Sequence, residues 1–425
     1  MEWIVPKQIR SLASNSIVSW GHSFLFDSFF PKLKRGQVSI DILDVNYTSY
    51  CTAKPMVFGD KDSLQKASII ITDLYNFTTK VLFAGDIGFS EAYILGYFNV
   101  DDMKNLLVSK NEMDGLDSKW AFLKHGVDRL YHIYHNNSVS GAKENIRAHY
   151  DLSNDMFSLF LDPTMSYSSA IFAGPDESLE DAQMRKIRKL IDKANLSSNH
   201  HLLEIGSGWG ALAMEAVRRT GCRVTTVSLS IEQVNLAQER IREAGLQDRI
   251  DVQLIDYRHI TDKYDRIISC EMIEAVGHEH YPEFFQAIER LLKPDGLFVI
   301  QFISFNDQRY DTYRKGCDFI QKYIFPGGLC PSITSIVNAS TSHSNLMLEH
   351  LENYGPHYAI TLNRWKQNLL TNRSKVLALP SFDEQFIRMF NYYFCYCEAA
   401  FETRTINLLQ MVFSRSLSLL YITLP

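Results

Sequence analysis

From Asn199 onward, the apolar residues of this chain alternate between short runs typical of strands and longer runs with helical spacing. The expected strands cover 201–206, 222–229, 249–255, 264–270 and 296–304, and the expected helices cover 208–219, 231–244 and 281–292. This alternation predicts an α/β fold with a mostly parallel, doubly wound, Rossmann-like sheet. Ligands of such sheets bind at the carboxyl ends of the strands, so the loops there are the candidate site.

The first strand-to-helix turn of this region, LLEIGSGWGALA, carries Gly206, Gly208 and Gly210 after Glu204. Glycine lets the backbone turn tightly and approach a ligand, and the free N–H groups of the next helix favour an anionic end. The spacing is GxGxG, whereas dinucleotide-binding turns use GxGxxG with a carboxylate about 20 residues later. No carboxylate lies between Arg223 and Ile231. The turn therefore favours S-adenosylmethionine over NAD, with a tight turn that binds nothing as the alternative.

Length and charge limit the remaining possibilities. A chain of 425 residues exceeds the usual size of a single core, so we expect a small domain at 1–130, a polar linker at 131–149 and a catalytic domain at 150–425. A net charge of -6 argues against a nucleic-acid partner. The seven cysteines form no CxxC pair, and no apolar run is long enough to span a bilayer. We therefore expect no metal and a soluble or peripheral protein in a reducing compartment.

Several motifs in order along the chain carry a resemblance to a known family. They are LFAGDIGFSEAYILGYFNVDD (82–102), YDLSNDMFSLFLDPTMSYSSAIF (150–172), LEIGSGWG (203–210), VSLSIEQ (227–233), CEMIEAVGHEHYPEFFQAIERLLKPDGLFVIQFIS (270–304), DFIQKYIFPGG (318–328), ENYGPHYAITLNRW (352–365) and QMVFSR (410–415). Together they resemble the cyclopropane-fatty-acyl-phospholipid synthases. The match runs from about residue 150 to 416 and extends into the smaller N-terminal domain.

This resemblance implies a class I methyltransferase that passes the methyl group of S-adenosylmethionine to a cis double bond of an acyl chain in a membrane phospholipid. Loss of a proton then closes a cyclopropane ring. A bound bicarbonate is the expected proton acceptor. The resemblance also implies a cytoplasmic protein at a membrane surface, and a homodimer is one candidate assembly.

The resemblance assigns the reaction site residue by residue. Glu274 would hold the bicarbonate, Tyr358 would donate a hydroxyl and Ile303 would offer a backbone contact. Ser169 replaces a cysteine of the bacterial pattern, where the contact is through the backbone, and Gln301 replaces a bicarbonate-binding histidine; glutamine donates but does not titrate. We therefore expect Glu274→Gln to leave cofactor binding nearly intact and to reduce turnover strongly.

The cofactor contacts implied by the resemblance surround the glycine turn. They are Tyr167 and Ser168 near the sulfonium, Glu204, Gly206, Ser207, Gly208 and Gly210 at the turn, Ser228, Leu229 and Gln233 after the second strand, and Tyr257 with Arg258 near the adenine. Tyr167 has an ordinary core tyrosine as its alternative. The sequence SIEQ (230–233) is also a capping box for the next helix.

Two further features of the chain allow two interpretations each. Glu271 lies in the same apolar run as Glu274, and either a site role or a solvated loop position is open to it. The run 386–401 has an apolar helical face that suits either a core or an acyl tunnel. Cys397 on this run is expected near the site as a pocket residue, not as a nucleophile.

Two motifs raise the question of a membrane contact and of a metal. Five apolar side chains precede Lys32, Lys34 and Arg35 in SFLFDSFFPKLKRG (23–36), which predicts either membrane docking or a domain entry. HEHY (278–281) lacks the HExxH spacing of a helical zinc site, so no metal is expected there.

Three functions compete with that of a cyclopropane synthase. The first is a small-amine N-methyltransferase, because certain plant alkaloid enzymes share this core. The second is an enzyme that leaves a methyl or methylene branch on the fatty acid. The third is a lipid-binding protein that has lost activity, for which Gln301 and the irregular tail SLSLLYITLP are the hints.

Overall fold

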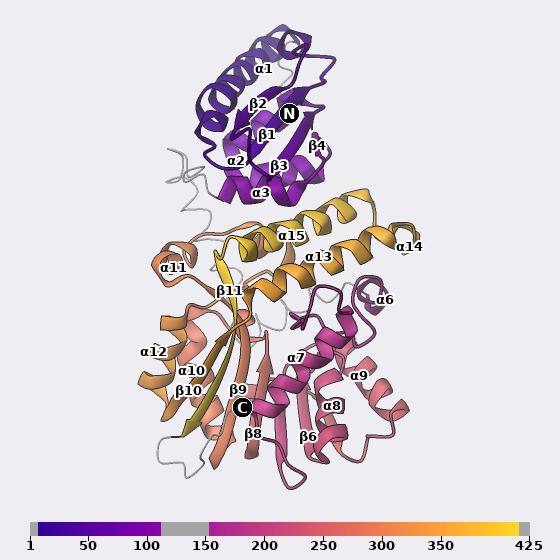
Figure 1. Ribbon diagram of the computed structural model, residues 1–425, viewed down its shortest axis with the longest axis vertical. Coiled ribbons are helices and arrows are strands. Elements are labelled where there is room, and N and C mark those ends of the chain that lie inside the picture. The colour runs from indigo at the N-terminus through magenta and orange to yellow at the C-terminus, as the bar shows by residue number, and fades with distance from the viewer. Residues whose placement is uncertain (1–6, 112–152, 416–425) are drawn as a thin grey trace, which may run out of the picture. The chain divides into compact units, whose positions relative to one another are not determined.

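The computed structural model describes residues 7–111 and 153–415, which form two compact units (Figure 1). The first unit combines the N-terminal segment with residues 377–403, and the second takes the chain up to 376 and from 404 onward. The expected linker, 131–149, lies outside the described residues. Residues 377–403 were expected in the catalytic domain, whereas they pack within the first unit.

The first unit is built on a four-stranded sheet of order β2-β1-β3-β4. Its strands are β1 (Gln37–Ile42), β2 (Met56–Gly59), β3 (Lys66–Ile71) and β4 (Phe98–Val100), and its helices are α1 (Lys7–His22), α2 (Leu74–Ile94), α3 (Met103–Asn111) and α15 (Glu384–Glu402). Every second residue of β1 and β3 is buried, as expected for strands with one face on a core. α2 contains a kink at Gly85, whose φ of 54° and ψ of -127° lie outside the helical region.

The segment 23–36 belongs to the core of the first unit. It forms a π-helix (Ser23–Phe29) and a 3-10 turn (Phe30–Lys32). Most of the apolar side chains that could have entered a membrane are buried: Leu25, Phe26, Phe29, Phe30 and Leu33. The expectation of apolar docking by this segment is therefore wrong, because its hydrophobic surface is already used in packing, while Lys32, Lys34 and Arg35 are exposed.

α15 is the apolar helix expected at 386–401, and it completes the first unit. Phe390, Tyr393 and Phe394 on it are buried. Arg388 fixes the helix to the small sheet, because its guanidinium donates to the carbonyl of Phe98 at 2.7 Å and lies 4.1 Å from the ring centre of Tyr93. The burial of these aromatic side chains fits the core interpretation, and the acyl-tunnel interpretation of the face stays a prediction.

The second unit contains a seven-stranded sheet of order β10-β11-β9-β8-β5-β6-β7. The strands are β5 (His201–Ile205), β6 (Arg223–Ser228), β7 (Ile250–Leu254), β8 (Tyr264–Cys270), β9 (Leu292–Phe305), β10 (Leu346–Asn353) and β11 (Ile406–Arg415). β5 to β9 pair in parallel, and β11 and β10 extend the sheet in antiparallel fashion. The predicted doubly wound sheet is confirmed.

Helices cover both faces of this sheet (Figure 1). They are α6 (Asn154–Ser158), α7 (Leu179–Lys193), α8 (Ala211–Thr220), α9 (Ile231–Glu243), α10 (Tyr281–Leu291), α11 (Asp307–Tyr313), α12 (Ile333–His343), α13 (Gly355–Thr371) and α14 (Arg373–Ala378). One core layer packs the sheet against α10 and α12, and a second layer packs it against α7, α8 and α9. Among the described helices, none is both long and apolar enough to cross a lipid bilayer.

Candidate functional site

The glycine turn between β5 and α8 has the geometry of a ligand loop. Gly206, Gly208 and Gly210 all have positive φ, at 96°, 46° and 86°. The N–H groups of Gly206 and Ser207 both donate to the carbonyl of Val227 at 3.0 Å, which fixes the turn to β6. A Cβ added to Gly208 would meet no atom of residues 7–111 or 153–415 within 4 Å, so these residues leave this side of the turn open. The turn therefore fits a ligand that approaches the backbone closely.

Glu204, at the end of β5, is buried beside this turn. The hydroxyl of Thr226 donates to its Oε2 at 2.6 Å. Burial raises the pKa of Glu204 to about 8, against the opposing effects of Thr226 and Lys186. A buried carboxyl with this surrounding gains most from a cationic partner, which the ammonium end of S-adenosylmethionine would supply.

The predicted contacts after β6 form a small polar group at the start of α9. The hydroxyl of Ser228 donates to Oε1 of Gln233 at 2.8 Å. Ser230 caps α9 by accepting from the N–H of Gln233 at 3.3 Å. Gln233 therefore contacts the turn after β6 through its side chain and the cap of α9 through its backbone N–H. Leu229 lies between them with partial exposure.

The two residues expected near an adenine have different surroundings. Tyr257 is buried, and its ring packs against Phe284 with 5.6 Å between centres. Arg258 pairs at 2.7 Å with Asp256, which lies in the loop after β7. Tyr257 is thus a core residue in packing, and Asp256 is a buried acid of this loop that the sequence motifs did not single out.

A segment before α7 lies over the carboxyl ends of the strands and is held by buried polar side chains. Gln183 of α7 donates to the carbonyl of Ser168 at 2.7 Å. Lys186, also on α7, donates to the Ser168 hydroxyl at 2.6 Å and lies 3.9 Å from the sulfur of Cys270. From α13, Thr361 accepts from the N–H of Ala170 at 3.1 Å. These anchors position Tyr167 and Ser169.

Tyr167 is the centre of an aromatic cluster formed by Phe157, Phe160, Tyr167, Phe325 and Trp365. Its ring centre lies 5.2 Å from those of Phe157 and Trp365, 5.9 Å from that of Phe160 and 6.2 Å from that of Phe325. Aromatic faces attract positive charge. The cluster therefore provides an apolar wall with affinity for a cation.

Glu271 follows the last residue of β8 with a φ of 50°, unusual for a residue other than glycine. Its Oε1 accepts from the N–H of Ser169 at 2.9 Å and from the amide of Gln301 at 2.7 Å. Its Oε2 accepts from the hydroxyl of Tyr358 at 2.7 Å. A solvated loop position does not describe Glu271, because three donors from different segments converge on its carboxylate.

Glu274 has a different surrounding. Its Oε1 accepts from the N–H of Ile303 at 2.6 Å, while its Oε2 is inaccessible to solvent and has no hydrogen-bond partner among the described residues. Burial, followed by the negative charge of Glu271, raises the pKa of Glu274 to about 8. The residues assigned to one anion site thus divide between two carboxylates: Ile303 contacts Glu274, whereas Ser169, Gln301 and Tyr358 contact Glu271.

A buried chain of amides fixes the orientation of Gln301. The Nε2 of Gln410, on β11, donates to Oε1 of Gln301 at 2.8 Å, and Gln410 in turn accepts from Lys193. Both glutamines are fully buried. Since the oxygen of Gln301 is used by Gln410, its NH₂ group is left to face Glu271.

Cys397 is on α15 in the first unit, and its expected role as a pocket residue stays a prediction.

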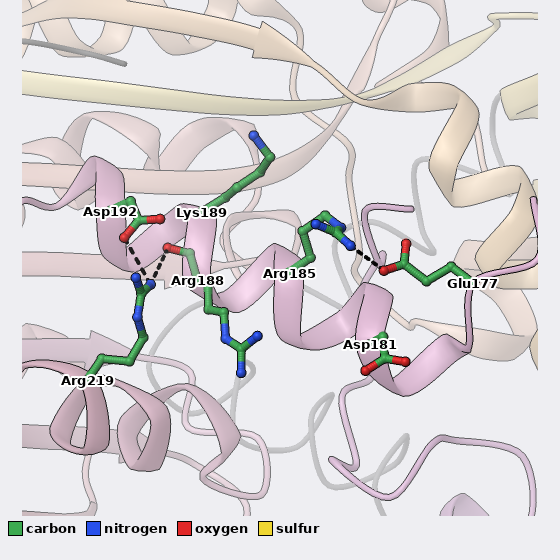
Figure 2. A pocket seen from close by; sticks show the side chains of 7 residues that line it. All are labelled: Glu177, Asp181, Arg185, Arg188, Lys189, Asp192 and Arg219. Carbon is green, nitrogen blue, oxygen red and sulfur yellow. Dashed lines mark hydrogen bonds and ion pairs between the residues drawn. The ribbon is translucent and has the colours of Figure 1, made fainter. Parts of the chain in front are cut away.

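A surface hollow on α7 is lined only by charged side chains, and Figure 2 shows Arg185 paired with Glu177 and Arg219 paired with Asp192. These are surface ion pairs, and none of the predicted site residues lines the hollow.

The sequence profile of the mycolic acid cyclopropane synthetases matches residues 137–411 of this chain. The chain belongs to this family. Its relatives include the tuberculostearic acid methyltransferase UfaA1 of Mycobacterium tuberculosis, 38% identical over 78% of this chain and 79% of the relative. The cyclopropane-fatty-acyl-phospholipid synthase of Escherichia coli (strain K12) is 35% identical over 80% of this chain and 86% of the relative.

Solved structures of the family share the fold. The cyclopropane synthase MmaA2 of Mycobacterium tuberculosis is 31% identical with a TM-score of 0.60, over 64% of this chain and 98% of that one. The mycolic acid cyclopropane synthase CmaA1, solved with S-adenosylhomocysteine, gives 32% and 0.60 over the same shares. The chain is therefore a class I S-adenosylmethionine-dependent methyltransferase of the cyclopropane fatty acid synthase type, as the sequence predicted.

Several site residues of this methyltransferase were not found from the sequence. Gln183, Lys186 and Thr361 lie on long helices where a polar residue looks like part of the solvated face, and only their burial reveals the role. The position of Lys186 three residues after Gln183 is a helical spacing that could have indicated a shared face. Nothing in the sequence indicated whether Glu271 or Glu274 would accept the hydrogen bonds of this site.

Proposed function

We propose that this methyltransferase transfers a one-carbon unit from S-adenosylmethionine to the cis double bond of an unsaturated acyl chain in a membrane phospholipid, and that it forms a cyclopropane fatty acid. The observation that carries this proposal is that Tyr358 contacts both the aromatic cluster and the carboxylate of Glu271. The centre of its ring lies 6.1 Å from that of Trp365, and its hydroxyl donates to Glu271.

An alkene is a weak nucleophile, so the reaction depends on positioning and on a dry pocket. S-adenosylmethionine, when bound, supplies a methyl carbon on a positively charged sulfur. The open glycine turn and Glu204 suit its amino-acid end. A Cβ on Gly206 would lie 3.5 Å from Met272, so the turn adjoins the segment that carries Glu271 and Glu274. The aromatic cluster shields the cationic carbon that forms when the alkene attacks, and a nearby carboxylate removes a proton.

A branched product is the second candidate. The relative with 38% identity is named a tuberculostearic acid methyltransferase, which is a specific reason to consider it. Ring closure and branching share the methyl transfer and differ in which proton leaves. The present geometry supports the shared step for both products.

An amine substrate and a loss of activity both have less support. A coclaurine N-methyltransferase structure is 17% identical with a TM-score of 0.59, which shows the common fold alone. Three relatives with 35% identity or more are named for fatty or mycolic acids. Loss of activity has no support at the glycine turn, which keeps the positive φ angles and open side that a ligand loop needs.

A phospholipid substrate implies work at a membrane surface. Because most apolar side chains of 23–36 are buried, the exposed Lys32, Lys34 and Arg35 offer an electrostatic contact instead. A cytoplasmic, peripheral location and a homodimer belong to this proposal.

Expression in a bacterium that lacks its own synthase tests the proposal. Mass spectrometry of the fatty acids should show gain of one methylene at the expense of unsaturated chains. Proton NMR then separates a ring from the isobaric methylene branch. A Gly208→Val chain, in which a side chain enters the open side of the turn, is the matched control. Methylation of amines with unchanged fatty acids would reverse the proposal.

A further inference from the structure

The donors expected to bind bicarbonate are occupied by a side chain of the protein. Ser169, Gln301 and Tyr358 place their hydrogens on the carboxylate of Glu271 at 2.9, 2.7 and 2.7 Å. A carboxylate and a bicarbonate present the same planar pair of oxygens to donors. The residues present therefore do not fit a free bicarbonate at this position, because its place is filled.

The supply of hydrogens supports the same conclusion. The backbone N–H of Ser169 and the hydroxyl of Tyr358 have one hydrogen each, and both are used on Glu271. A second anion would find these donors engaged and would lie against the negative charge of Glu271. Two anions at this distance coexist only if one takes up a proton.

We propose that Glu271 is the proton acceptor of this enzyme and takes the place that a free bicarbonate would fill. The role of Glu271 as proton acceptor rests on the proposed function. The exclusion of bicarbonate rests only on the contacts that Glu271 makes. It adds a catalytic residue that the sequence left undecided, and it predicts activity without bicarbonate.

The backbone at Glu271 supports a functional role. A φ of 50° is unfavourable for a residue with a side chain, so the conformation persists only when the surroundings impose it. Its N–H donates to the carbonyl of Gln301 at 2.7 Å, which holds the residue at the end of β8. The same glutamine thus fixes both the backbone and the carboxylate of Glu271.

The charged groups around Glu271 suit a base. Lys186 of α7 is the nearby cation, and the hydroxyl of Tyr358 on α13 donates to the carboxylate. Burial raises the pKa of the Cys270 thiol on β8 to about 11, and Glu274 is the second acid. Burial raises the pKa of Glu271, while Tyr358, Gln301, Ser169 and Lys186 oppose this rise. A raised pKa makes the carboxylate a stronger proton acceptor. Glu274, whose pKa is about 8, stays protonated at neutral pH and adds no second charge.

The chemical step balances without another reactant. The π electrons of the alkene form a bond to the methyl carbon, and the carbon–sulfur bond breaks with its electron pair on sulfur. A C–H bond of the transferred methyl then breaks. Its electron pair closes the ring on the cationic carbon, and the proton moves to a carboxylate oxygen of Glu271, which later releases it to water.

Binding of carbon-13-labelled bicarbonate, followed by NMR, tests the exclusion independently of the reaction. The wild-type chain should not bind it, whereas Glu271→Gly should, because glycine tolerates the positive φ and removes the carboxylate. Thermal unfolding checks that the variant folds. Specific binding to the wild-type chain would overturn the proposal, and so would failure of a folded Glu271→Gly chain to bind.

Activity in bicarbonate-free buffer gives the second arm. The wild-type chain should be fully active, and Glu271→Gln and Glu271→Gly should lose about 10²- to 10⁴-fold in turnover. Added bicarbonate should restore Glu271→Gly but not Glu271→Gln, whose amide still fills the place. The control is Glu279→Gln, an acid with 84% exposure in the same loop, which should keep wild-type turnover. A wild-type requirement for bicarbonate would overturn the inference while leaving the proposed function intact.

Discussion

Two glutamates three residues apart have opposite surroundings in this enzyme. Within the part of the chain that the structure describes, Glu271 accepts three hydrogen bonds from side chains and backbone, whereas Glu274 accepts one and keeps an inaccessible oxygen without a partner. The sequence could place both beside the cofactor turn, because they follow a strand of a parallel sheet. It could not assign their roles, since the donors come from segments about 30 to 100 residues away whose side-chain directions only the packing decides.

Glu274→Gln should change the pH dependence of stability. The folded chain keeps Glu274 protonated up to about pH 8, whereas the unfolded chain loses this proton near the ordinary value. Between these values the folded state binds more protons, so the unfolding free energy of the wild type falls as pH rises, by up to about 1.4 kcal/mol per unit. The glutamine variant should lack this contribution in urea unfolding at pH 5, 6.5 and 8. Parallel curves for the two chains would contradict the assignment.

Tyr358→Phe should keep the ring contact with Trp365 and lose the hydroxyl that donates to Glu271. A hydrogen bond to a charged group contributes about 1.5–3 kcal/mol, so turnover at neutral pH should fall about 10- to 100-fold. The acid limb of the pH–rate profile should move to higher pH, because loss of a donor raises the pKa of Glu271. Tyr354→Phe is the control, since its hydroxyl contacts Glu352 instead. An unmoved profile in Tyr358→Phe would argue against Glu271 as the base.

At the scale of elements, the sequence was most informative where strands and helices alternate. The five parallel strands β5 to β9 and the helices α8, α9 and α10 lie where periodicity placed them, within a few residues. The antiparallel β10 and β11 were not predicted, because β11 pairs with β9 and β10 pairs with β11 across more than 50 residues of sequence, and no local pattern specifies these pairings. Ala84-Gly85-Asp86 is a sequence typical of a turn between separate elements, and the structure has a kink within α2 there instead.

Gly85→Ala should destabilise the chain through this kink. The φ of 54° with a ψ of -127° is a region that only glycine adopts freely, and no atom lies within 4 Å of an added Cβ. The cost is therefore backbone strain alone, about 1–3 kcal/mol. Gly174→Ala also meets no atom and has no positive φ, so it should be nearly neutral. Urea unfolding of both variants checks this, and equal stabilities would show that the kink is not a strained conformation.

At the scale of the molecule, composition excluded more than it identified. A net charge of -6 argued against a nucleic-acid partner, and the ordered motifs over most of the chain led to the family. The division into two units was only partly accessible, because the contribution of 377–403 to the first unit joins segments about 300 residues apart. The buried face of 23–36 shows the same limit, since an apolar run next to basic residues looks the same in the sequence whether it packs in a core or contacts a membrane.

Replacement of Lys32, Lys34 and Arg35 by glutamine should weaken binding to anionic phospholipid vesicles. Each basic residue near such a surface contributes about 1 kcal/mol, so the affinity should fall about tenfold or more at low salt. Sedimentation with vesicles measures this, and high salt should reduce the difference between the two chains.

The control for net charge replaces three exposed lysines elsewhere in the first unit, Lys54, Lys61 and Lys66, by glutamine. This chain should bind the vesicles more tightly than the variant at 32, 34 and 35. Equal binding by that variant and the wild type would place the membrane contact elsewhere.

The most direct test of the proposed reaction is transfer of label from S-adenosylmethionine with a carbon-13 methyl group to purified vesicles of unsaturated phospholipid, in buffer free of bicarbonate. We predict that labelled carbon enters a cyclopropane ring of the acyl chain at the wild-type rate with or without added bicarbonate. Label that never reaches the acyl chain would contradict the function, and label that reaches it only after bicarbonate is added would contradict the role of Glu271.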